Sequence, residues 1–171
     1  LTKDILMDLI EKYIHLEIED EKKPRKTWRM IFPRYHQLDV VTKVVNDVKK
    51  NWCWKNYLIQ HSAGSWKSNS IAWLAYRLSS LHNEKDEKIF DSVIVVTDRR
   101  VLDSQLQNTI YQFDHVEWVV EKIDNDKHSS DLRDAINNWK KIIITTLQKF
   151  PYIYEEIDAR WKKFAVIIDE A

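Results

Sequence analysis

The fold of this chain is decided by the stretch His61-Ser62-Ala63-Gly64-Ser65-Trp66-Lys67-Ser68. It follows the apolar residues Tyr57 to Ile59 and opens a run with helical spacing from Ser68 to Leu81. A strand, a tight loop and Lys-Ser at a helix start form the layout of a phosphate-binding loop. Backbone N–H groups and the helix dipole at such a start favour bound phosphate.

The loop residues predict how ATP and Mg²⁺ are held. Lys67 is expected to reach the outer phosphates, and the Ser68 hydroxyl to bind Mg²⁺. The backbone around them is expected to line the phosphates at Ser62, Ala63, Gly64, Ser65 and Trp66. An ordinary strand-to-helix turn is the alternative. One residue departs from the pattern, because the position before the lysine should be glycine and is Trp66.

Composition bounds the class of protein. The chain has 171 residues, 44% of them hydrophobic, which suits one domain with a sizeable core. Its 27 basic and 27 acidic residues cancel, which gives no support to a freestanding nucleic-acid binder but leaves room for a local basic groove. Cys53 is the single cysteine, and the six histidines lack metal-ligand spacing. Because no signal peptide or long apolar run occurs, we expect a cytoplasmic protein without a membrane partner.

Glycine and tryptophan are out of balance. The chain has one glycine and eight tryptophans, whereas average usage of about 7% predicts roughly 12 glycines. Several tryptophans stand in polar connectors, where turns and helix ends call for glycine. We hypothesise that the natural protein has glycine at these positions, through a UGA codon that some bacteria read as glycine. A tryptophan-rich natural sequence is the alternative. The tryptophans for which we expect glycine in the natural protein are Trp52, Trp54, Trp66, Trp139 and Trp161.

The order of apolar runs predicts an α/β fold with a parallel sheet flanked by helices. Residues 1–26 are expected to be a helical linker, with a helix from Thr2 to Ile18 and a charged end containing Pro24. Residues 27–171 form the main domain, and we expect the chain to be a piece of a longer protein. Predicted strands are 57–61, 92–97, 116–120, 141–146 and 164–169; predicted helices are 38–50, 68–81, 98–113, 131–138 and 152–160.

Two carboxylates follow the last predicted strand. Ligands bind outside the carboxyl ends of parallel strands, where ATPases need one carboxylate for Mg²⁺ and another to orient water. We assign Asp169 to the metal and Glu170 to the water, with a solvated turn as the alternative.

Near residue 34, Arg34 and Gln37 are candidates for binding the nucleotide, because the Gln37 amide suits an adenine edge. A polar helix start is the alternative there.

Polar residues also follow two other buried strands. Hydroxyl, amide and cationic groups at these positions suit contacts with a nucleic-acid backbone. Helix capping by Thr97 or Asp98 is the alternative interpretation. The candidate residues for binding DNA are Thr97, Arg99, Arg100, Thr145, Thr146 and Gln148.

Taken together, these blocks resemble the motor subunit of type I restriction enzymes, within helicase superfamily 2. Similar blocks are Pro33 to Gln37, Gln60 to Ser68, Val95 to Arg99, Ile143 to Phe150 and Val166 to Ala171. The resemblance implies the first RecA-like lobe of a motor that hydrolyses ATP to pull double-stranded DNA. It also implies specificity and methyltransferase subunits as partners, and an upstream nuclease domain that residues 1–26 join to the motor.

Two alternatives remain open. The chain could be a lobe of another superfamily 2 helicase that acts on DNA or RNA. It could instead be a structural or DNA-binding lobe without hydrolysis, which Trp66 would favour if the tryptophan is genuine.

Overall fold

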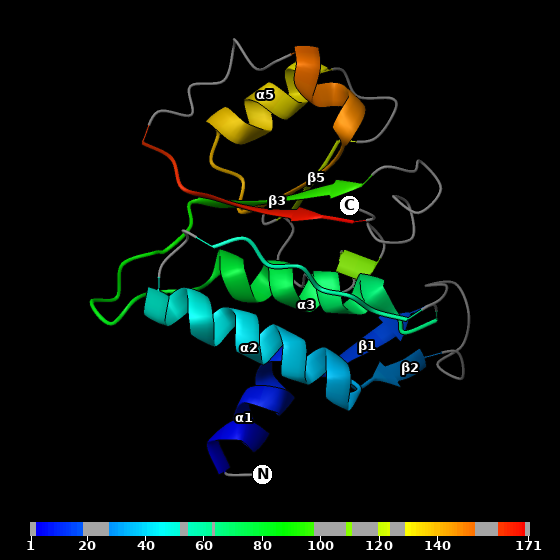
Figure 1. The fold of residues 1–171 in the computed structure, drawn as a ribbon. Coiled ribbons are helices and arrows are strands. Elements are labelled where there is room, and N and C mark those ends of the chain that lie inside the picture. Colours follow the sequence, from blue (N-terminus) through cyan, green and yellow to red (C-terminus); the bar gives the residue numbers. More distant parts are fainter. Residues whose placement is uncertain are drawn as a thin grey trace.

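The computed structural model describes residues 3–18, 28–51, 55–62, 64–97, 109–110, 120–123, 129–152 and 161–169. Figure 1 shows helices on both sides of a sheet, with the N-terminal elements packed at one end. The helical elements are α1 (Lys3–Lys12), α2 (Tyr35–Asn51), α3 (Lys67–Ser79), α5 (Ser129–Asn137) and the 3₁₀ helix η2 (Leu147–Tyr152). The strands are β1 (His15–Ile18), β2 (Trp28–Ile31), β3 (Ser92–Thr97), β4 (Val120–Lys122), β5 (Ile142–Thr146) and β6 (Phe164–Ile168).

The described residues form a four-stranded parallel sheet in the order β4-β5-β3-β6. In its register Val96 lies beside Ile168 and Thr97 beside Thr146, so the strands end at one edge. This confirms the predicted α/β class and the strands predicted at 92–97, 141–146 and 164–169. The continuous apolar runs of β3 and β5 have a physical reason, because these strands are buried on both faces, as is usual in parallel sheets. Val166 and Ile168 of β6 are exposed.

Successive residues of the central strands enter two separate cores. Ile142 and Ile144 pack with Val93, Val95 and the apolar faces of α2 and α3. Ile143, between them, packs on the other face with side chains of α5. Figure 1 shows this arrangement, with α3 on one side of the sheet and α5 on the other. Because successive side chains of a strand point to opposite faces of the sheet, one strand contributes to both cores.

The N-terminal elements contribute to the larger core. Leu9 and Tyr13 are buried in the cluster that holds Trp73. The Trp73 Nε1–H donates to the Tyr13 carbonyl at 2.9 Å, and Arg77 donates to the Asp8 carboxylate at 3.0 Å. The charges of Lys12 and Arg77 lower the pKa of Asp8 despite the opposing effect of its burial. Residues 3–18 therefore pack on α3, while the boundary at residue 26 stays a prediction.

The predicted helix from Thr2 to Ile18 is wrong beyond Lys12. The N–H groups of Tyr13 and Ile14 both donate to the Leu9 carbonyl, which ends the helix. His15–Ile18 instead pairs antiparallel with Trp28–Ile31. Helical periodicity could not reveal this pairing, because the partner strand lies beyond the charged segment.

The predicted strand at 57–61 is also wrong. These residues carry no strand assignment, and Leu58 is 90% exposed. The segment is tied to α2 at its start, where the Tyr57 hydroxyl and Lys55 donate to the Asp47 carboxylate at 2.7 and 3.1 Å. Desolvation, and then the hydrogen bond to Asp47 and its negative charge, raise the pKa of Tyr57 to about 12. Tethering to a helix thus replaces pairing in the sheet.

The remaining predicted elements agree in part. The helices predicted at 38–50, 68–81 and 131–138 are confirmed by α2, α3 and α5, although their bounds differ by a few residues. The short β4 begins where the strand predicted at 116–120 ends, and residues 116–119 lie outside the described residues. Most of the helices predicted at 98–113 and 152–160 lies outside them too. No described helix is long and apolar enough to cross a membrane.

The backbone at three tryptophans supports the glycine hypothesis. Among described residues other than glycine, four have positive φ, namely Trp66 (62°), Trp139 (59°), Trp161 (71°) and Asp86 (61°). A Cβ makes this left-handed conformation costly, whereas glycine adopts it readily. Trp139 also follows the end of α5, a position where glycine is usual. Trp73 is buried and behaves as an ordinary core residue; Trp52 and Trp54 lie outside the described residues.

Trp161 offers a test of this backbone argument, because its side chain is 96% exposed. Trp161→Gly should raise the free energy of unfolding by about 1 kcal/mol, since glycine removes the cost of a Cβ at positive φ. Trp161→Ala is the matched control, which removes the indole but keeps the Cβ, and it should change stability little. Urea denaturation measures both. Equal stabilities of the glycine and alanine variants would contradict the argument.

Candidate active site

The predicted phosphate loop is a tight turn between the segment at 55–62 and α3. Gly64 has φ 74°, and the Ser65 N–H donates to the Ser62 carbonyl at 3.2 Å. A Cβ at Gly64 would meet no atom within 4 Å, so backbone conformation alone favours glycine there. Trp66 precedes the first residue of α3 with φ 62° and ψ 50°. Ala63 lies outside the described residues.

The Trp66 side chain lies beside the loop, with half of its surface exposed. The Arg34 guanidinium is 5.9 Å from the centre of the indole ring, a cation–π distance. Arg34, a predicted nucleotide-binding residue, therefore contacts the residue that departs from the phosphate-loop pattern. The backbone at Trp66 has a left-handed conformation that suits glycine.

Gln37 is buried against the same turn. Its amide nitrogen donates to the carbonyls of Ser65 and Trp66 at 3.2 and 3.1 Å. Its amide oxygen accepts the Arg34 backbone N–H at 2.8 Å. Both amide hydrogens are thus used, and one lone pair of the oxygen remains. Gln37 joins α2 to the loop in this structure, and its predicted contact with adenine stays a prediction.

Two histidines flank the loop, and sequence analysis missed them because it considered histidine only as a metal ligand. The His36 Nε2 lies 3.4 Å from the Ser65 carbonyl oxygen. The rings of His36 and His61 are 5.5 Å apart between centroids, in an edge-to-face arrangement. The signal available in the sequence was position, because His61 opens the loop and His36 stands next to Gln37.

The structure brings Lys67 and Asp169 together although they are far apart in the sequence. The Lys67 Nζ lies 3.6 Å from the Asp169 Oδ1. The Asp169 N–H donates to the Val96 carbonyl at 2.9 Å, which fixes the residue at the end of β3. A cation at the helix start therefore faces a carboxylate at the carboxyl edge of the sheet. The catalytic roles assigned to both residues stay predictions.

The side chains assigned to Mg²⁺ have suitable donor chemistry. Ser68, in the first turn of α3, and Asp169 supply oxygen, the donor that Mg²⁺ prefers. No group of three or more histidine, cysteine or acidic side chains among the described residues could hold a metal. Mg²⁺ is usually held by one or two carboxylates together with substrate phosphates, and its binding by Ser68 and Asp169 stays a prediction. Glu170 lies outside the described residues.

The predicted DNA-binding residues differ in their exposure to solvent. Thr97, Thr145 and Thr146 reach the carboxyl edge but are buried there. In the described part of the chain, the Thr97 and Thr145 hydroxyls have no hydrogen-bond partner. Gln148 is exposed on η2. Arg99 and Arg100 lie outside the described residues, so DNA contact by this set stays a prediction.

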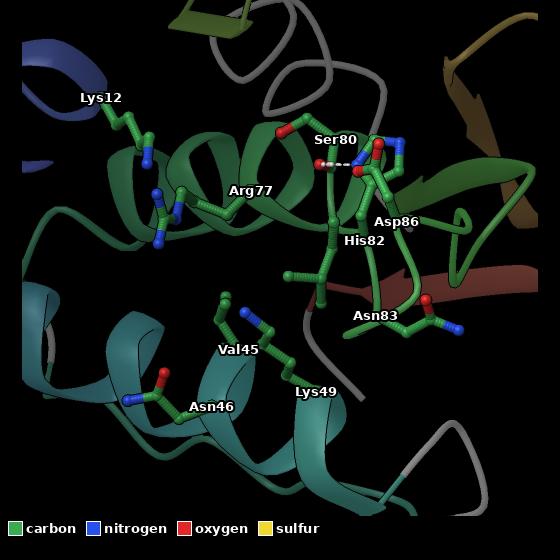
Figure 2. Close-up of a pocket in the computed structure, with 10 residues that line it drawn as sticks. Lys12, Val45, Asn46, Lys49, Arg77, Ser80, His82, Asn83 and Asp86 are labelled. Carbon is green, nitrogen blue, oxygen red and sulfur yellow. Dashed lines mark hydrogen bonds between the residues drawn. The ribbon is translucent and has the colours of Figure 1, made fainter.

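A pocket of about 380 Å³ lies at the other end of α3. Figure 2 shows basic side chains around it from the last turns of three helices, namely Lys12 of α1, Lys49 of α2 and Arg77 of α3. Cations near helix C-termini offset the negative ends of the helix dipoles. Lys12 and Arg77 are also paired with Asp8. The pocket includes neither Lys67 nor Asp169 and is separate from the candidate active site.

The parallel sheet flanked by helices and the turn before α3 define a RecA-like α/β lobe. The family model of SWI2/SNF2 ATPases matches residues 36–171, most of the chain. The chain therefore belongs to the SWI2/SNF2 ATPase family, and this membership implies ATP as its ligand. No curated protein matches the chain.

A solved helicase structure has a similar fold. The chain is similar to the UvsW helicase from bacteriophage T4, with a TM-score of 0.56 and 15% sequence identity. The alignment covers 98% of this chain and 50% of the UvsW chain. The chain thus spans about half the length of that structure, and the likeness concerns the fold alone.

Proposed function

We propose that this chain is the first RecA-like lobe of an ATP-dependent double-stranded DNA translocase in a type I restriction-modification system. The observation that carries the proposal is the meeting of Lys67 and Asp169 at 3.6 Å, in a chain of an ATPase family. The restriction context rests on the resemblance of the sequence blocks. It includes DNA as substrate, and specificity and methyltransferase subunits as partners.

The chain's own residues bind and orient the nucleotide in this proposal. Lys67 exchanges its contact with Asp169 for the outer phosphates of ATP, and backbone N–H groups at the start of α3 face the phosphates. Gln37 holds the loop through the carbonyls of Ser65 and Trp66. Ser68 and Asp169 would hold Mg²⁺, which would supply positive charge against the charge that develops on the phosphates. Glu170 orients the attacking water.

Trp66→Gly should strengthen the binding of Mg-ATP by about tenfold or more, which corresponds to about 1.4 kcal/mol. The backbone of a phosphate loop approaches the nucleotide closely, so the residue before the lysine needs a small side chain. Calorimetric titration of Mg-ATP into both forms measures the change. Trp161→Gly is the matched control, because it makes the same substitution at positive φ away from the loop.

The outcomes of that titration separate the functional interpretations. Equal, tight binding by the Trp66 form would show that the steric argument is wrong. Absent binding in both forms would favour the structural or DNA-binding lobe without hydrolysis. UGG at Trp73 together with UGA codons at five other tryptophans would support the glycine hypothesis independently. These five are Trp52, Trp54, Trp66, Trp139 and Trp161.

Glu170→Gln in the complete enzyme should abolish ATP hydrolysis and leave ATP binding largely intact. The change removes the charge that orients water but keeps the size of the side chain. Duplex-stimulated ATPase activity and nucleotide affinity are the two measurements. Near-normal turnover in the variant would remove Glu170 from its proposed role.

The similarity to UvsW, a helicase by its description, keeps another superfamily 2 helicase as the second candidate. Stimulation of the complete enzyme separates the two functions. Double-stranded DNA should stimulate the ATPase of a translocase, whereas stimulation by single strands or RNA alone would favour the second candidate.

A further inference from the structure

His61 occupies an unusual position at the entrance to the phosphate loop. It is the first residue of the loop stretch, and its ring lies 5.5 Å from that of His36 between centroids. The His61 Nε2 is buried and has no hydrogen-bond partner among the described residues. Because buried polar atoms are normally paired, such an atom calls for an explanation.

The surroundings of His61 favour the neutral form of its ring. Burial lowers the pKa of His61, and the nearby His36 of α2 and Lys67 of α3 lower it further. Beyond them, Asp169 pairs with Lys67. The His36 Nε2 is engaged with the Ser65 carbonyl, so the two imidazoles differ in their hydrogen bonding.

A bound polyphosphate would reverse this electrostatic balance. Its negative charges would lie beside Lys67 at the start of α3 and would oppose the positive potential that Lys67 imposes on His61. An opposite charge nearby favours the protonated form of an imidazole. The ring would then gain a proton in the pH window between its lowered pKa in the free chain and its higher pKa in the complex.

We propose that His61 is a further nucleotide-binding residue, which takes up one proton when a nucleoside triphosphate binds and then adds a positive charge beside Lys67. The inference rests on the proposed function, since it needs a phosphate loop that binds ATP. It concerns the affinity for the nucleotide and not the chemical step. Binding linked to proton uptake strengthens as the pH falls through the window.

Calorimetric titration of Mg-ATP into the Trp66→Gly chain at about pH 6.5 tests the proposal, because this is near the ordinary pKa of histidine. Titrations in two buffers with different heats of ionisation give the number of protons taken up. The Trp66→Gly chain, which is the parent of the variants below, should take up several tenths of a proton to one proton per ATP. In His61→Gln, which keeps a hydrogen-bonding group but does not titrate, uptake should fall to nearly zero and affinity should fall about threefold or more.

Two control variants locate the proton. His82→Gln changes a histidine in the loop after α3 that bonds to the Ser80 carbonyl, and it should bind ATP with the same uptake as the parent. His36→Gln should retain uptake, because His61 is the group that titrates. Loss of uptake in His36→Gln, with retention in His61→Gln, would overturn the assignment.

The remaining outcomes separate this inference from the proposed function. Binding of ATP with no proton uptake in the parent, or with equal uptake in His61→Gln, would overturn the inference alone. Absence of ATP binding in the Trp66 and Trp66→Gly forms would overturn the proposed function and this inference with it. Circular dichroism of each variant confirms that a change in binding does not come from unfolding.

Discussion

The parallel pairing of β6 with β3 is the constraint on which the candidate site depends. It places Val96 beside Ile168, and the next N–H of the chain, that of Asp169, then donates to the Val96 carbonyl. The carboxylate is thereby held at the edge where α3 begins, 3.6 Å from the Lys67 ammonium. Neither side chain could reach the other through local structure, because the whole β3–β4–β5 part of the sheet lies between them in the sequence.

A second constraint acts on the loop itself. Gln37 is buried and binds two consecutive loop carbonyls, so the start of α2 and the turn before α3 hold each other. Removing this buried amide would cost free energy, because the loop carbonyls would lose their hydrogen bonds without gaining bonds to water in exchange. The loop backbone is thus fixed by α2 even though Trp66 takes a conformation that suits glycine. Nucleotide recognition and loop conformation would be coupled through one side chain.

Sequence analysis predicted those parts of the fold in which one physical signal dominates. Continuous apolar runs identified β3 and β5, in which every residue is buried, and also β6, although its Val166 and Ile168 are exposed. The apolar run at 57–59 gave a similar signal, yet it forms no strand in the described part of the chain, and its Tyr57 bonds to Asp47 of α2. A short apolar run does not reveal its partner. Likewise, the pairing of His15–Ile18 with Trp28–Ile31 is a contact between distant segments that periodicity does not encode.

The candidate site was predictable in its residue types and less so in its contacts. Lys67, Ser68 and Asp169 were assigned from spacing, because a strand end and a helix start are local features. The double hydrogen bond of Gln37 and the buried Nε2 of His61 depend on how α2 approaches the loop, and no local pattern indicates that. The excess of tryptophan, by contrast, was visible in composition, and the positive φ of Trp66, Trp139 and Trp161 gives it a physical meaning.

The most direct test of the account is a crystal structure of the Trp66→Gly chain with Mg²⁺ and a non-hydrolysable ATP analogue. The account predicts the polyphosphate at the start of α3, with Lys67 on the outer phosphates and Ser68 and Asp169 around the metal. A nucleotide bound elsewhere, for example in the basic pocket of Lys12, Lys49 and Arg77 shown in Figure 2, would contradict it.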